Sequence, residues 1–176
     1  ETMAVSRFQS FLDFSIGATA SNQYNLTEDS SIGYIASIGL KRDYEYYEDF
    51  FNGTVEKENL NKPLEPYSEQ KGEYGQIKNL ASALLGLSLK TKLSKYRLNF
   101  LAIKSGESSA IKAMYKEFIE NPYNGDASLL TYTERNILSL PFSSQHIFNE
   151  GDLSLDIKIA PSIVKVYDKD FKKTVF

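Results

Sequence analysis

Residues 77–105 read IKNLASALLGLSLKTKLSKYRLNFLAIKS, and apolar residues recur at every second position on both sides of a short polar break. Alternate positions from 81 to 89 are apolar, and so are alternate positions from 96 to 102. Successive side chains of a strand point to opposite faces, so this period predicts two strands that each present one apolar face. The break at Lys92-Leu93-Ser94 predicts that a tight turn joins them as an antiparallel pair.

The same alternation appears along much of the 176-residue chain. These predicted strands exceed the ~5–6 residues of a typical globular strand and suit the ~9–11 residues of a tilted membrane strand, with some overhang. A second tight turn is predicted at Asn149–Asp152, where Asn, Gly and Asp favour turn conformations. Six strands are predicted in all, at residues 8–19, 31–43, 77–91, 95–105, 134–148 and 152–166.

The remaining connections are predicted to be long loops, one at Tyr44–Gln76 and one at Gly106–Thr133. Long connections that alternate with tight turns are typical of bacterial outer-membrane barrels, which have long extracellular loops and short periplasmic turns. The second loop is predicted to contain one short helix over residues 108–120, because apolar residues recur there at helical spacing. These residues are Ile111, Met114, Tyr115, Phe118 and Ile119.

Aromatic residues concentrate near the ends of the predicted strands. Tyr96 and Phe148 lie beside the tight turns, and Tyr167 and Phe171 lie at the opposite end of the last strand. Such placement indicates the two aromatic belts that bracket the lipid-facing band of a membrane barrel. A further aromatic group follows the second strand, where that strand would leave the membrane outward. It consists of Tyr44, Tyr46, Tyr47, Phe50 and Phe51.

Composition excludes several classes of function. The chain has no Cys and one His, which excludes disulfide scaffolds, thiol catalysis and multi-His metal sites. A net charge of −3 gives no electrostatic reason to expect a nucleic-acid partner. A mean hydropathy of −0.36 argues against helical membrane proteins only, because polar positions on a barrel dilute its lipid-facing stripe.

No pattern predicts a catalytic residue, a metal ligand or a cofactor. Ser109 and Lys112 match a Ser-x-x-Lys pattern, but the companion motifs of penicillin-recognising enzymes are missing. His146 is interpreted as a hydrogen-bonding residue near a strand end, since no nucleophile elbow accompanies it. The acidic residues Glu45, Glu48, Asp49, Asp168 and Asp170 have no calcium-loop spacing and are interpreted as solvated charge.

An ordered series of short motifs resembles the mid-barrel part of TonB-dependent receptors from Bacteroidetes-type bacteria. The series covers most of residues 8–176, and its specificity comes from the order and spacing of the motifs rather than from any one of them. One departure is Ile157, where the family often has Trp, a residue this chain lacks. The motifs are 32–37 (IGYIAS), 83–90 (ALLGLSLK), 95–98 (KYRL), 105–110 (SGESSA), 132–136 (YTERN), 146–148 (HIF), 155–162 (LDIKIAPS) and 167–176 (YDKDFKKTVF).

The resemblance implies an all-β, antiparallel, up-and-down transmembrane barrel segment of about six strands, within a barrel of 22 strands in the bacterial outer membrane. It implies substrate uptake by a receptor, with no enzyme activity. The implied partners are outer-membrane lipid, the plug domain of the same parent chain, the TonB system and a surface lipoprotein. The side chains implied to face the lumen and its plug are Arg97, Asn99, Asp156 and Lys158. The extracellular loop residues implied to bind substrate are Tyr44, Tyr46, Tyr47 and Phe50.

The two ends lead to the expectation that the chain is a slice of a larger protein. Residues 1–7 have no signal-peptide features, and residues 170–176 lack the alternation of a closing barrel strand. Two alternatives stay open from the residues alone. One is a small, complete outer-membrane barrel with a structural or adhesive role, and the other is a soluble carrier of the lipocalin type.

Overall fold

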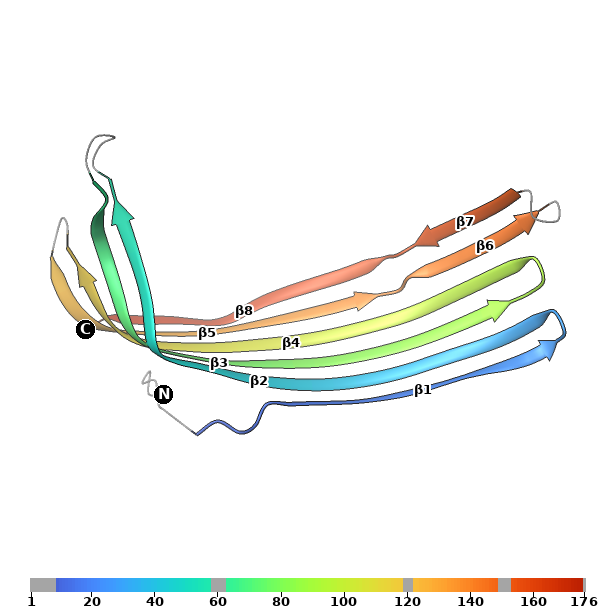
Figure 1. Cartoon of the computed structure of the whole chain (residues 1–176), viewed down its shortest axis with the longest axis horizontal. Coiled ribbons are helices and arrows are strands. Elements are labelled where there is room, and N and C mark those ends of the chain that lie inside the picture. The colour runs from blue at the N-terminus through green and yellow to red at the C-terminus, as the bar shows by residue number, and fades with distance from the viewer. Residues whose placement is uncertain (1–8, 58–62, 119–121, 149–152, 176) are drawn as a thin grey trace.

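In the computed structural model the described residues, 9–57, 63–118, 122–148 and 153–175, form one antiparallel β-sheet and contain no helix. The sheet is a single curved layer (Figure 1). Its strands are β1 (Phe14–Thr27), β2 (Ser30–Glu56), β3 (Glu65–Lys90), β4 (Ser94–Glu117), β5 (Tyr123–Ser139), β6 (Phe142–Phe148), β7 (Leu153–Ile159) and β8 (Ser162–Val175).

The eight strands make six antiparallel passes. The order is β1-β2-β3-β4-β5-β8, while β6 pairs with β4 and β7 pairs with β6. Prolines divide the last two passes, because Pro141 and Pro161 have no N–H to contribute to the ladder. Their carbonyls still accept bonds, from Asn99 N at 2.9 Å and from Leu140 N at 3.0 Å. Each of the six predicted strands therefore overlaps one pass of the sheet, and two passes are split at proline. The bounds differ, since β1 begins at Phe14 and continues to Thr27, beyond the predicted range of 8–19.

Tight turns join neighbouring strands at one end of the sheet (Figure 1). Thr91 N donates to Ser94 O at 2.7 Å, which confirms the predicted turn between β3 and β4. Glu28 and Asp29 form a second turn, which the sequence analysis did not predict, and Thr27 Oγ1 and Ser30 Oγ lie 2.7 Å apart across it. The turn predicted at 149–152 lies outside the described residues.

The two predicted long loops are wrong. Most of 44–76 continues β2 and β3 as a paired hairpin, in which Glu45 faces Gln76 and Glu56 faces Glu65. Most of 106–133 likewise continues β4 and β5, with Glu107 opposite Thr133. The strands curve strongly toward this end of the sheet (Figure 1), where β3 stays paired with β4 as far as Ser68 and Glu117.

The helix predicted over 108–120 is also wrong, because residues up to Glu117 belong to β4. The backbone of this segment bonds to two strands at once, so that Ser109 lies between Gln76 of β3 and Thr131 of β5. Two complete ladders satisfy the backbone groups that a helix would pair internally. The apolar residues fit a helical period, but pairing with β3 and β5 makes this segment a strand. Ile119 lies outside the described residues.

The sheet has no covering layer within the described residues. Ala113 is the one buried hydrophobic residue there, at 5% exposed, while large apolar side chains such as Ile38 remain 65% exposed. The edges are open as well, since β1 pairs only with β2 and β7 only with β6. Within the described part of the chain, no helix is long and apolar enough to span a membrane.

Candidate functional site

Strand register sorts the side chains onto two unlike faces. Directly opposed residues of antiparallel strands share a face, so Ile38, Ala83 and Ala102 lie together. We call this the apolar face and its central part the apolar band. The band consists of Ile16, Ala18, Ala20, Ile32, Tyr34, Ala36, Ile38, Leu40, Ala81, Ala83, Leu85, Leu87, Leu89, Leu98, Phe100, Ala102, Leu138, Phe142, Leu155, Ile157, Ile159 and Ile163.

Aromatic residues border the apolar band at both ends of the strands. At the tight-turn end the apolar face carries Tyr24, Tyr96 and Phe148, with His146 between the last two. His146 Nδ1 lies 2.9 Å from Ser94 Oγ, and its ring packs edge-on against Tyr96 at 5.3 Å, in agreement with the predicted hydrogen-bonding role. At the other end the same face carries Phe14, Tyr44, Tyr132 and Tyr167.

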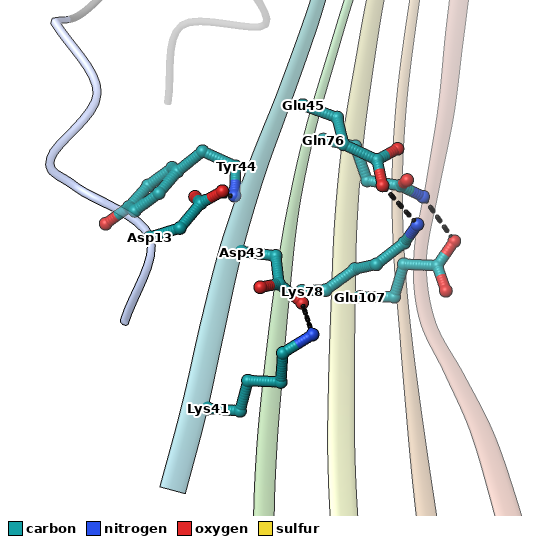
Figure 2. A network of polar contacts seen from close by, with 8 residues as sticks. All are labelled: Asp13, Lys41, Asp43, Tyr44, Glu45, Gln76, Lys78 and Glu107. Carbon is teal, nitrogen blue, oxygen red and sulfur yellow. Dashed lines mark hydrogen bonds and ion pairs between the residues drawn. The ribbon is translucent and has the colours of Figure 1, made fainter. Parts of the chain in front are cut away.

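The opposite face, which we call the polar face, carries a charged network where β2, β3 and β4 run side by side (Figure 2). Lys78 Nζ donates to Glu45 Oε1 at 2.8 Å, and this bond raises the pKa of Lys78. Gln76 is 8% exposed and donates to Glu107 Oε1. These residues meet because register sets Asp43 opposite Lys78, and Lys78 opposite Glu107.

This network borders a hollow of about 250 Å³ on the polar face. Arg135 of β5 lines the hollow and forms no ion pair with the described residues, whereas Lys41 pairs with Asp43 at 2.7 Å. Neighbouring hydroxyls extend the polar surface, since Thr133 Oγ1 donates to Asp168 at 2.8 Å. The arrangement presents cations, carboxylates and hydroxyls together and is suited to binding a polar surface or solute.

The predicted lumen-facing residues all lie on the polar face. Arg97, Asp156 and Lys158 line one hollow of about 240 Å³, because Ser143 stands between Arg97 and Lys158 in register. Asn99 lines a neighbouring hollow of about 410 Å³ beside Gly86. Whether these side chains contact a plug stays a prediction. Between the hollows the polar face also carries an apolar patch of Leu84, Leu101, Ile103, Ile137 and Val164.

The four predicted binding aromatics divide between the two faces. Tyr47 and Phe50 lie on the polar face, each with its ring centroid 5.9 Å from that of Tyr74. Tyr44 and Tyr46 lie on the apolar face, where they line a hollow of about 450 Å³. Strand alternation causes the split, and the register shift between Tyr47 and Phe50 keeps those two rings on one side.

Tyr74 is the member of this aromatic group that sequence reasoning missed. It lies in the predicted loop 44–76, and only the register of β2 with β3 brings it between Tyr47 and Phe50. Burial raises the pKa of its hydroxyl, and Glu107 and Glu45 add to the shift. Tyr115 and Tyr123 form a second ring pair, 5.4 Å apart, farther along the polar face.

A second charged cluster lies on the apolar face, just beyond the apolar band. Glu134 is 7% exposed and accepts from Lys169 Nζ at 2.7 Å and from Asn136 Nδ2 at 3.1 Å, while Lys104 Nζ lies at 3.3 Å. The bond from Lys169 is the main cause that lowers the pKa of Glu134 to about 2. No local pattern predicts this cluster, because its members come from β4, β5 and a register shift in β8.

The described residues do not assemble a recognisable catalytic group. Ser109 bonds the hydroxyl of Thr131 at 2.6 Å and lies on the face opposite Lys112, so the two cannot act as a Ser-Lys pair. No cluster of three His, Cys, Asp or Glu residues within the described ranges could hold a metal ion. A scan against protein-family models found no match, and no curated protein matches the sequence.

Proposed function

We propose that this chain forms part of the wall of an outer-membrane β-barrel, with the apolar face toward lipid and the polar face toward the lumen. The observation that carries the proposal is the apolar band, whose side chains stay exposed with nothing packed on them among the described residues. Water-soluble proteins rarely leave contiguous apolar patches of more than a few hundred Å² uncovered. Exposing such a patch to water costs free energy, and contact with lipid in place of water would remove this cost.

The dimensions and borders of the band support the proposal. Along β2 the band runs from Ile32 to Leu40, close to the ~9–11 residues with which a tilted strand crosses a bilayer. Aromatic side chains border it at both ends on the same face, as in the interfacial belts of membrane barrels. The tight turns at one end and the long hairpins at the other match the periplasmic and extracellular sides of such barrels.

We further propose that the barrel belongs to a transporter of the TonB-dependent receptor type, which takes up a scarce substrate. The resemblance of the sequence motifs supports this assignment. The polar face supports it as well, because Arg97, Asp156 and Lys158 beside an apolar patch suit contact with a folded plug in the lumen. The open edges of the sheet would pair with further strands of the same barrel.

The aromatic group on the polar face would contact substrate near the extracellular mouth. Tyr47, Phe50 and Tyr74 present clustered ring faces there, beside the carboxylates of Glu45 and Glu107. Tyr44 and Tyr46, on the outer side of the wall, would not meet a substrate in the lumen. The chemical identity of the substrate is left open among siderophore, glycan, peptide and metal complex.

Substrate uptake by cells that express the full-length protein tests this assignment. Tyr47→Ser combined with Phe50→Ser is expected to lower uptake about tenfold, the order of one lost aromatic anchor at a binding site. Tyr44→Ser combined with Tyr46→Ser is the matched control and is expected to change uptake less than twofold. Equal losses in both variants, or no loss in either, would contradict a lumenal role for the aromatic group.

A further inference from the structure

The two ends of the apolar band differ in charge. At the tight-turn end the bordering residues on the apolar face are the rings of Tyr24, Tyr96, His146 and Phe148. At the hairpin end, cations stand among the rings. This basic belt consists of Arg42 on β2, Lys104 on β4, and Lys165 and Lys169 on β8.

The basic belt carries more positive charge than its own carboxylates neutralise. Lys104 and Lys169 share one carboxylate, that of Glu134. Arg42 and Lys165 form no ion pair with any described residue, and the guanidinium of Arg42 lies 5.2 Å from the ring centroid of Tyr44. Among the described residues, two further acids lie in or beside these rows of the sheet. They are Asp170 and Asp13, whose Oδ1 accepts from Tyr44 N at 2.7 Å, so the belt keeps a positive excess of one.

The spacing of the belt suits more than one anionic group. Neighbouring strands lie ~4.8 Å apart, so Arg42, Lys104 and Lys165, each two strands from the next, stand roughly 10 Å apart across the sheet. Each cation also stands beside the apolar band on the same face. A molecule bound here would therefore place its anionic group on the belt and an apolar tail on the band.

We propose that the basic belt binds the phosphorylated head group of a membrane lipid, whose acyl chains lie along the apolar band. The inference rests on the proposed membrane location. Charge complementarity identifies the phosphate, and the uninterrupted continuation of the belt into the exposed apolar band identifies a lipid as its carrier. Among the described residues, the apolar face carries no such cations at the tight-turn end, so we expect binding at the leaflet of the hairpin end.

Titration of the full-length protein with fluorescent short-chain phosphatidic acid, and with the matching phosphatidylcholine, tests this proposal in neutral detergent. The unmodified protein should prefer phosphatidic acid. Arg42→Gln combined with Lys165→Gln removes the two unpaired cations and is expected to weaken phosphatidic acid binding about tenfold, without changing phosphatidylcholine binding. Lys90→Gln combined with Lys95→Gln removes equal charge from the polar face and should change neither affinity by twofold.

Three outcomes overturn the lipid site. They are equal affinity of the unmodified protein for the two lipids, equal losses in the two double variants, and displacement of phosphatidic acid by equimolar inorganic phosphate. Insertion into phosphatidylcholine vesicles separates this failure from failure of the proposed function. A protein that inserts but has no preference for phosphatidic acid lacks the lipid site only, whereas a protein that does not insert contradicts both.

Discussion

The half of the sheet near the tight turns and the half formed by the long hairpins are held together differently. Near the turns, side-chain alternation is regular, and the apolar band gives the strands an apolar stripe on one face. In the hairpins the same strands continue through Glu45, Lys78 and Glu107 with charged and aromatic cross-strand contacts. Both halves are thus held by strand pairing. Along each strand, however, the side chains change from a regular apolar stripe to charged and aromatic contacts.

The first prediction tests the contrast between the two halves where the largest effect is expected, in the middle of the apolar band. Ile38→Lys places a charge on the exposed apolar face and is expected to destabilise the protein in vesicles by about 2–4 kcal/mol, the cost of a cation near the bilayer midplane. Unfolding by urea from vesicles measures the change. Ser37→Lys, one residue away on the polar face, is the control and should cost far less.

A neutral effect of Ile38→Lys would contradict the lipid-facing assignment, because a 65% exposed side chain in water tolerates such a change.

The second prediction concerns close packing in the hairpin half. A Cβ at Gly72 would overlap the backbone of Lys112 and Ala113, so Gly72→Ala is expected to destabilise this part of β3 and β4 by about 1–3 kcal/mol. Amide hydrogen exchange of residues 68–75 measures the loss. A Cβ at Gly75 meets nothing within 4 Å, which makes Gly75→Ala the control with little expected effect.

If Gly72→Ala weakened exchange protection in the tight-turn half equally, the two halves would unfold as one unit and the contrast between them would not hold.

The third prediction concerns the ring contacts of Tyr74. Tyr74→Leu keeps an apolar side chain but removes the ring that contacts Tyr47 and Phe50, and it should destabilise the hairpin by about 0.5–1.5 kcal/mol. Hydrogen exchange of the β2–β3 amides measures this difference. Tyr34→Leu, on the apolar band without a ring partner among the described residues, should leave the hairpin amides unchanged.

The smallest effect is expected from acid titration of Glu134. Its pKa is about 2 in the folded protein and 4.5 ordinarily, so its ion pairs stabilise the fold above pH 4.5, and this contribution is lost as the pH falls toward 2. Both lysine side chains are about half exposed or more, which keeps the contribution small. Glu134→Gln should remove this part of the pH dependence of unfolding.

If the stability of Glu134→Gln depended on pH between 4.5 and 2 as that of the unmodified protein does, the pH dependence would come from other carboxylates.

The contrast between the halves also explains which parts of the fold were predictable. Residues 32–40 were predicted as a strand because apolar and polar side chains alternate there, as they do when the two faces of a strand have different surroundings. Residues 108–117 were not, because their strand is held by backbone pairing to β3 and β5, which leaves no periodic trace in the side chains. The contacts of Glu134 and Tyr74 were not predicted for the same reason, since only the strand register brings their partners together.

Spin-label accessibility along β2 tests the central claim most directly. Single labels at residues 31 to 41 of the full-length protein in vesicles would be exposed to oxygen, which partitions into lipid, and to a polar nickel complex. The account predicts maxima for oxygen at 32, 34, 36, 38 and 40, and maxima for nickel at the odd positions between them. Even positions that are shielded from both reagents, as in a soluble carrier with an apolar interior, or exposed to nickel, would contradict it.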